Sequence, residues 1–358
     1  MTPATAARAG TCSTTGATTG ALTGAATGVT AGVATAAASG VDEGVGLTAL
    51  LVAAARAIES RRPDALARDP LAEHFVRAAR ASAHWPVHPR DVPPGADGGD
   101  DPLWGRLGGY FALRTRALDD HLLRAAQLGA RQVVLLGAGL DARAHRLDWP
   151  PGTTVFELDR ARVLGFKQQV LDRVGARPTA RRVPVACDLR LDWAGALTAA
   201  GFRPGEPTAW LAEGLLLYLP AAAERRLIAT VDRLSAAGSS LAYEVKLGME
   251  HAAVRRNPVY LAARDRLGID LLVLFDDEPR PDTAADLADR GWATVTHTPF
   301  EFTRHYGRGP RPEPDDALAA NRWSFATRGP LPGPRRPDPG LETRPETGPE
   351  PGAGAGRG

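Results

Sequence analysis

A pair of glycines and three acidic residues each follow a run of apolar residues in this chain, namely Gly137, Gly139, Asp159, Asp188 and Glu213. Short apolar runs are typical of buried strands, and in an open α/β sheet ligands bind beyond the carboxyl ends of the strands. Carboxylates there accept hydrogen bonds from hydroxyl and amino groups, and glycines let the backbone approach a ligand closely. The pattern therefore predicts a site for a small molecule that carries several hydrogen-bond donors.

Two classes of cofactor compete for this site. Gly137, Gly139 and Ala142 match the G-x-G-x-x-G/A fingerprint of dinucleotide binding, and acids follow about 20 residues later. Asp141, however, would begin the next helix, and its carboxylate would lie where the dinucleotide-binding fold holds a pyrophosphate of the same charge. Asp188 also has no evident role in binding NAD. S-adenosyl-L-methionine has no phosphate, and its sulfonium, ribose diol and adenine amino group all suit carboxylates. The charges favour S-adenosyl-L-methionine, with an NAD(P)-dependent oxidoreductase as the alternative.

Each of these features also has a simpler structural explanation. A lone Gly-x-Gly after a strand is often only a tight turn, and Asp159 and Asp188 could cap the helices that follow them. Cys187 has the size and polarity of an ordinary core residue. The recurrence of acids at successive predicted strand ends favours a binding site over these separate explanations.

The strands that would position these residues alternate with helical patterns. Near-continuous apolar strands separated by helices predict a parallel sheet covered on both faces, and the short spacing of the last two runs predicts an antiparallel pair. The predicted strands are 132–138, 153–159, 182–188, 208–218, 240–245, 292–298 and 323–328. We expect an α/β fold with one seven-stranded, mostly parallel, doubly wound sheet.

An N-terminal helical extension is predicted to precede this sheet. Thr48 is expected to cap a first helix, and Asp69, which proline follows, is expected to cap a second. Residues 85–103, rich in Pro, Gly and Asp, are expected to form a long loop of the kind that covers a site or moves. A third helix is predicted to end at Gly129.

Both ends of the chain have a composition typical of disorder. Residues 1–40 are mostly Ala, Thr and Gly with one charged residue, and 329–358 are rich in Pro and Gly. Neither stretch has enough large apolar groups to offset the entropy of ordering, and the first lacks the apolar core of a secretory signal. We expect one folded domain over 41–328 between two disordered tails.

The overall composition argues against several classes of partner. The net charge is +2, from 43 basic and 41 acidic residues, which gives no reason to expect a nucleic acid or an anionic membrane. Lys167 and Lys246 are the only lysines. Two cysteines provide no disulfide framework, and the histidines lack zinc-ligand spacing. We expect a cytoplasmic protein with no metal site and no membrane span; the sequence leaves its oligomeric state open.

Seven stretches in a fixed order carry a resemblance to a known family. They are TALLVAAARAIES, DPLAEHFV, ALRTRALDDHL, RQVVLLGAGLDARAHRLDWP, VFELD, CDLR–DW and PTAWLAEGLLLYL. The set resembles the S-adenosyl-L-methionine-dependent methyltransferases of actinobacteria, relatives of leucine carboxyl methyltransferase and of polyketide O-methyltransferases. The resemblance implies a class I methyltransferase (Rossmann-like) fold, S-adenosyl-L-methionine as cofactor and a role in secondary metabolism.

The resemblance also implies which residues bind the cofactor. Asp159 would hold the ribose hydroxyls, Asp188 and Leu189 would bind the adenine, and Glu213 would lie near the methionyl end or the acceptor. One arginine of the Arg114-Thr-Arg116 stretch would pair with the methionyl carboxylate, a task that suits a guanidinium; we favour Arg116. The full set is Arg114, Arg116, Gly137, Gly139, Asp159, Asp188, Leu189 and Glu213.

The reaction implied by the resemblance is O-methylation of a carboxylate or hydroxyl on a small molecule or peptide. A carboxylate acceptor would need no general base, whereas a hydroxyl would benefit from one. Tyr218, His297 and His305 are predicted near the sheet, but none is assigned as a catalytic residue. A noncatalytic scaffold that binds S-adenosyl-L-methionine is a further alternative. The family usually has proline soon after the aspartate that corresponds to Asp159, and its absence here is expected to alter the start of the next helix.

Overall fold

Seven strands form a single sheet. They are β1 (Gln132–Leu136), β2 (Thr154–Asp159), β3 (Arg181–Ala186), β4 (Thr208–Ala212), β5 (Ser240–Lys246), β6 (Trp292–His297) and β7 (Asn321–Arg328). Their order is β3-β2-β1-β4-β5-β7-β6. β7 runs antiparallel to β5 and β6, and the other neighbours are parallel. The predicted mostly parallel sheet and its antiparallel last pair are both confirmed.

The computed structural model describes residues 41–95, 101–247, 256–314 and 316–329. Both predicted disordered tails, apart from Gly329, lie outside these ranges. No helix in the described ranges combines the length and apolar character needed to cross a membrane.

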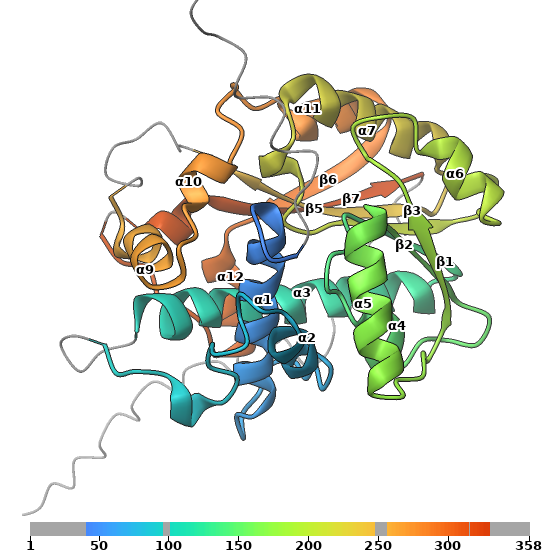
Figure 1. Cartoon of the computed structure of the whole chain (residues 1–358). Helices are drawn as coiled ribbons and strands as arrows, with labels where there is room; N and C mark the ends of the chain where they lie inside the picture. The colour runs from blue at the N-terminus through green and yellow to red at the C-terminus, as the bar shows by residue number, and fades with distance from the viewer. Residues whose placement is uncertain (1–40, 96–100, 248–255, 315, 330–358) are drawn as a thin grey trace, which may run out of the picture. The chain divides into compact units, whose positions relative to one another are not determined.

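Helices cover both faces of the sheet (Figure 1). α6 (Ala194–Ala199), α7 (Ala221–Leu234) and α11 (Thr283–Asp289) lie on one face. α3 (Gly108–Gln127), α4 (Arg143–Arg146), α5 (Ala161–Arg173) and α12 (Pro299–Tyr306) lie on the other. Outside this second layer lie α1 (Val45–Ser60), α2 (Ala72–Ala78), η3 (Pro102–Leu107) and α9 (Pro258–Leu267). The short elements η2 (Pro89–Asp91), η4 (Leu216–Tyr218), α10 (Leu271–Leu274) and η5 (Ala317–Ala320) complete the described structure.

The central strands are apolar on both sides because both sides are buried. On β1, Val134 and Leu136 pack toward α7, whereas Val133 and Leu135 pack toward α3. All five residues of β1 are buried, as expected for a strand in the middle of a covered parallel sheet. This burial explains why the apolar runs predicted the strands well.

The predicted start of the first helix is wrong. α1 begins at Val45, so Thr48 lies inside the helix, where its Oγ1 donates a hydrogen bond to Val45 O at 2.7 Å. A threonine hydroxyl can bond to a carbonyl of the preceding turn as readily as it caps a helix. Similarly, α2 begins only at Ala72, although Asp69 does hold the preceding turn by accepting from Leu71 N at 3.1 Å.

Two other predicted segments differ from the structure. The stretch 85–103, predicted as a loop, contains η2 and the first residues of η3. η3 begins there because Asp101 caps it, accepting a hydrogen bond from Trp104 N at 2.6 Å. The run 208–218 is a strand only as far as Ala212, because Gly214 (φ 57°) turns the chain toward η4.

Candidate functional site

The glycine turn after β1 bends the chain away from the strand. Gly137 and Gly139 have φ angles of 68° and 46°, in the left-handed region that glycine tolerates best. A Cβ at Gly137 would lie 3.1 Å from Cδ1 of Leu215, closer than side chains pack comfortably. The turn itself therefore favours glycine at these positions, whatever ligand lies beside it.

Asp159, at the end of β2, holds this turn in place. Its Oδ2 accepts a hydrogen bond from Gly139 N, and its Oδ1 accepts one from Arg160 N, both at 2.7 Å. Burial raises the pKa of the carboxyl above its usual value, although these two N–H groups oppose the rise. The N-cap of α5 is Arg160 and not Asp159. The aspartate therefore binds the glycine turn and does not begin a helix.

Asp188 and Leu189 follow the neighbouring strand, β3. The ends of the two strands are joined, because Cys187 N donates to Asp159 O at 2.9 Å. A hydrogen-bonded pair with Arg190 lowers the pKa of the Asp188 carboxyl to about 2. Burial raises the pKa of the Cys187 thiol to about 11, so this thiol stays protonated at neutral pH. The three residues predicted for the nucleoside thus occupy adjacent strand ends.

Glu213, directly after β4, is the centre of a buried ionic network. Its Oε1 accepts from Nε of Arg114 at 3.0 Å, and its Oε2 accepts from Nη1 of Arg143 at 2.7 Å. Arg143 is fully buried and also pairs with Asp119 and Asp141. Burial opposes ionisation of Glu213, but the charges of Arg143 and Arg114 outweigh it and hold the pKa well below the usual range.

Arg114 and Arg116 lie on different faces of α3. The guanidinium of Arg114 is buried, and its Nη1 donates to Oε2 of Glu244 at 2.7 Å. Arg116 is exposed and pairs with Asp120 one turn further along the helix. Residues two positions apart point to nearly opposite sides of a helix with 3.6 residues per turn. The structure therefore places Arg114 beside Glu213, and not the Arg116 that we favoured from the sequence.

Glu244 on β5 joins Arg114 to Tyr110, which lies one turn earlier on the same face of α3. Its Oε1 accepts a short hydrogen bond from the hydroxyl of Tyr110, which in turn accepts one from Nε1 of Trp323 at 3.1 Å. Burial, together with the charge of Glu244, raises the pKa of Tyr110, so the phenol stays protonated. These contacts fix Glu244 and, through it, the guanidinium of Arg114.

Helix α1 covers the glycine turn. A Cβ at Gly139 would lie 3.6 Å from Cβ of Ala49. About two turns further along α1, Nη2 of Arg56 donates to Leu140 O at 3.3 Å, and its Nε lies 3.5 Å from Oδ2 of Asp69. The N-terminal extension is therefore part of the site, as well as a covering layer.

The network contains more acid than base. Arg56 and Asp69 form a pair whose charges cancel. The rest of the network joins three arginines (Arg114, Arg143 and Arg146) to four carboxylates (Asp119, Asp141, Glu213 and Glu244). Nη2 of Arg143 is buried and has no hydrogen-bond partner in the described part of the chain. Buried polar groups are normally paired. The excess negative charge and the unpaired donor together indicate a ligand that carries both a cation and an acceptor.

Several members of this network were missed from the sequence. Asp119 and Arg143 lie within stretches that carry the family resemblance, but neither was assigned a role. Tyr110 and Glu244 were not singled out at all. Spacing along the chain gives little signal for them, because Arg114 and Glu244 are 130 residues apart.

The three residues considered as possible bases have different surroundings. Burial raises the pKa of Tyr218 to about 12, so its hydroxyl is a donor at neutral pH. His297 lies with Nδ1 2.6 Å from Oε2 of Glu301 at the start of α12. His305 is exposed on the same helix. Only Tyr218 is among the groups that interact electrostatically with Arg114 and Glu244.

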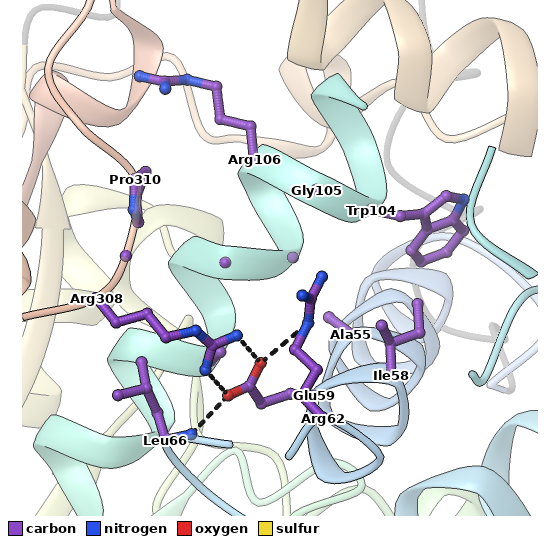
Figure 2. A pocket seen from close by; sticks show the side chains of 14 residues that line it. Ala55, Ile58, Glu59, Arg62, Leu66, Trp104, Gly105, Arg106, Arg308 and Pro310 are labelled. Carbon is purple, nitrogen blue, oxygen red and sulfur yellow. Dashed lines mark hydrogen bonds and ion pairs between the residues drawn. The ribbon is translucent and has the colours of Figure 1, made fainter. Parts of the chain in front are cut away.

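A pocket of about 190 Å³ lies toward the other end of α1 (Figure 2). Its walls come from α1, η3, the start of α3 and residues 308–310. Glu59 in its wall accepts from Nη2 of Arg308 at 2.8 Å and from Leu66 N at 2.6 Å, and lies 3.6 Å from Nε of Arg62. Its carboxylate is thus already paired, and none of the residues predicted from the sequence lines this pocket.

Comparison with known proteins identifies close relatives. The chain matches the model of the leucine carboxyl methyltransferase family over residues 49–232. A Streptomyces coelicolor protein, named as an S-adenosyl-L-methionine-dependent methyltransferase, is 66% identical over 286 residues, which cover 80% of this chain and 93% of that protein. A Saccharopolyspora erythraea protein with the same type of name is 49% identical over 250 residues, which cover 70% and 83% respectively.

Solved structures are similar only at a distance. That of a DUF574 family protein from Streptomyces avermitilis has a TM-score of 0.45 and 20% identity, covering 63% of this chain and 85% of that chain. That of magnesium protoporphyrin IX methyltransferase from Synechocystis, with bound SAH, has a TM-score of 0.40 and 13% identity, covering 62% and 86%. At these scores the structural similarities add nothing to what the sequence relatives show.

Proposed function

Since the chain belongs to the leucine carboxyl methyltransferase family, we propose that it transfers a methyl group to an oxygen of a small molecule or peptide. The fold is that of the class I methyltransferases, and the protein is an S-adenosyl-L-methionine-dependent methyltransferase. The oxidoreductase and the noncatalytic scaffold that we weighed from the sequence are thereby set aside. The oxygen acceptor, either a carboxylate or a hydroxyl, is the part that we propose.

The charge of the strand-end site is the observation that supports S-adenosyl-L-methionine as the cofactor, and the oxygen acceptor is supported by the match to the leucine carboxyl methyltransferase family. The network around Glu213 has one more carboxylate than guanidinium groups. S-adenosyl-L-methionine has a net charge of about +1, because its sulfonium and ammonium outweigh its carboxylate. A pyrophosphate would instead add negative charge to a site that is already negative. The network therefore supports a cationic cofactor.

We propose that the cofactor is held by Gly137, Gly139, Asp159, Asp188, Leu189, Glu213 and Arg114. Asp159, already beside the glycine turn, would accept hydrogen bonds from the ribose hydroxyls. Arg114 takes the place that we first gave to Arg116, because it shares Glu213 with Arg143. The unpaired Nη2 of Arg143 would offer the methionyl carboxylate a second donor.

When bound, S-adenosyl-L-methionine would supply a methyl group on a cationic sulfur; an acceptor oxygen would attack the methyl carbon in line, and the sulfur would leave as the neutral thioether of S-adenosylhomocysteine. The chain itself has to position the two partners, an effect worth up to about 7–11 kcal/mol in well-oriented systems. Glu213 contributes by being only partly exposed and fixed by two guanidiniums before any ligand arrives. α1 contributes by covering Gly139 and so limiting access of water to the turn.

Tyr218 is suited to orient the acceptor and not to deprotonate it. With a pKa of about 12 its hydroxyl remains a donor over the physiological range. A carboxylate acceptor is already ionised and needs no base, whereas a hydroxyl acceptor would have to lose its proton elsewhere. Tyr218 is therefore compatible with both kinds of oxygen.

We also propose that residues 41–328 form the catalytic domain and that the protein acts in the cytoplasm, on an acceptor other than a nucleic acid. The domain proposal is supported by the sheet and its helices, all of which lie between Val45 and Arg328. The location is supported by the two cysteines of the chain, which provide no disulfide framework.

The test of the acceptor oxygen uses cofactor labelled in the methyl group. The full chain is incubated with this cofactor and a low-molecular-weight cell extract, and the labelled products are then treated with mild base. A methyl ester would release volatile labelled methanol, and a product that survives base would be assigned by the NMR chemical shift of its labelled methyl carbon. A methyl ester or a methyl ether supports O-methylation. Label recovered only on nitrogen, sulfur or carbon, or no transfer at all, would overturn the proposal.

A further inference from the structure

Lys246, at the end of β5, lies among aromatic rings. Its Nζ lies 5.3 Å from the ring centroid of Tyr260 and 5.5 Å from that of Phe275. The ring of Tyr218 lies 5.7 Å from that of Phe275. We refer to Tyr218, Lys246, Tyr260 and Phe275 as the lysine cluster.

The ammonium group of Lys246 has no acidic partner in the described part of the chain. Its one hydrogen-bond acceptor there is Oδ1 of Asn321 at 3.3 Å. That amide is fixed, because its Nδ2 donates to Leu318 O at 3.1 Å. Lys246 is only partly exposed, and within the described ranges this cation lies beside a neutral amide and ring faces and not beside a carboxylate. The cluster is thus prepared to bind an anion.

Strand β5 links this cluster to the cofactor network. Glu244 precedes Lys246 by two residues, so both side chains lie on the same face of the strand, about 7 Å apart along it. Glu244 is bound to Arg114, which in turn binds Glu213. An acceptor extended along this face of β5 would therefore run from Lys246 toward the proposed position of the reacting methyl group.

Helix α1 provides a second, independent link. Thr48 lies close enough to Tyr218 of the lysine cluster to influence the pKa of its phenol. Ala49, the next residue, is the one that a Cβ on Gly139 would approach to 3.6 Å. Adjacent residues of one helix thus lie beside the glycine turn and beside the lysine cluster.

We propose that Lys246 determines acceptor specificity by binding a carboxylate of the methyl acceptor, while the aromatic rings contact the apolar part of the same molecule. This inference rests on the proposed function. The bound carboxylate is an anchor and is not methylated, because pairing with an ammonium reduces the nucleophilicity of its oxygens. The methylated oxygen belongs to another group of the acceptor, nearer to Glu213. A lysine suits this role, since its compact ammonium charge can bind a single oxygen, whereas the rigid guanidinium of arginine favours binding both oxygens of a carboxylate at once.

The experiment uses the scarcity of lysine in this chain. Full-length protein labelled with [ε-13C]lysine contains only Lys167 and Lys246 as labelled residues, and the Lys246→Met variant assigns the two NMR signals. Lys167 is fully buried in a pair with Glu157 and serves as an internal control. The probes are 3-phenylpropionate and its amide, which differ in charge and not in shape. Each is titrated with and without saturating S-adenosylhomocysteine.

We expect the acid to shift the Lys246 signal in a saturable way and to leave the Lys167 signal unchanged, with the amide binding at least about tenfold more weakly. Lys246→Met should lose this preference, and Lys246→Arg should keep part of it; both should bind S-adenosylhomocysteine with unchanged affinity. Equal shifts by acid and amide, no shift by the acid, or an unaltered preference in Lys246→Met would overturn the inference. Failure of the wild type to bind S-adenosylhomocysteine would instead count against the proposed function.

Discussion

Replacing Asp159 by asparagine removes the charge that we propose for the ribose hydroxyls and keeps the shape of the side chain. A hydrogen bond to a charged group contributes about 1.5–3 kcal/mol, whereas one to a neutral group contributes about 1 kcal/mol. Two ribose hydroxyls would therefore lose about 1–4 kcal/mol in total, which corresponds to an increase of about 5–700-fold in Kd. Calorimetric titration with S-adenosylhomocysteine measures this change directly.

The stability of the same variant should change little, because two effects oppose each other. Asparagine Oδ1 can still accept the hydrogen bond from Gly139 N, but its Nδ2 cannot accept the one that Asp159 accepts from Arg160 N. The folded-state pKa of Asp159 is raised, so its favourable contribution is complete below the unfolded pKa and is lost as the pH rises through the folded value. At neutral pH the ionised group is therefore slightly destabilising, and its removal offsets part of the lost hydrogen bond; we expect the free energy of unfolding to change by no more than about 1 kcal/mol.

The pH dependence gives a third, linked result. Affinity of the wild type for S-adenosylhomocysteine should fall as the pH is lowered through the raised pKa of Asp159, since a protonated carboxyl is a poorer acceptor. The asparagine variant should lack this part of the dependence. An unchanged Kd in the variant would remove Asp159 from the site, and a matching loss of thermal stability would mean that the residue acts only through folding.

Three further predictions test the turn, the network and the domain boundaries. Gly137→Ala should cost about 1–3 kcal/mol of unfolding free energy, measured by urea denaturation; Gly175→Ala is the control, because its φ is 64° but no atom lies within 4 Å of an added Cβ. A smaller or equal loss at position 137 would show that the contact with Leu215 is unimportant. Arg143→Met should lower the free energy of unfolding by about 3–5 kcal/mol, since it leaves buried carboxylates unpaired. Arg116→Met, on the exposed face of α3, should change it by less than about 0.5 kcal/mol. Similar losses in the two variants would refute the role of the network. Removal of residues 1–40 and 330–358 should leave the Kd for S-adenosylhomocysteine within about twofold by calorimetry, and a large loss of affinity would place part of the site in those segments.

The strands could be predicted because burial on both faces gives them an unambiguous pattern. The run that became β1 is apolar at nearly every position, as both its faces pack against helices. The run at 208–218 looked equally apolar, but its second half belongs to a turn and to η4, which pack against the core without extending the strand. Thr48 failed as a helix start because the same hydroxyl can bond within a helix or cap one.

The candidate site could be predicted only where topology alone places the residues. Gly137, Asp159 and Asp188 follow strands, and parallel strands bring their carboxyl ends together. The partners of Arg143 and Arg114 come from other elements, so their identity depends on how α3 and α4 pack on the sheet. Apart from the rarity of lysine in this chain, no pattern in the sequence pointed to Lys246. The aromatic rings of the lysine cluster come from three separate segments of the chain.

Calorimetric titration of the full chain with S-adenosylhomocysteine, and separately with NAD⁺, tests the central claim most directly. We predict saturable binding of one S-adenosylhomocysteine per chain and no measurable binding of NAD⁺. The absence of S-adenosylhomocysteine binding, or its displacement by NAD⁺, would contradict the view that the carboxyl edge of this sheet is an acidic site for a phosphate-free adenosine cofactor.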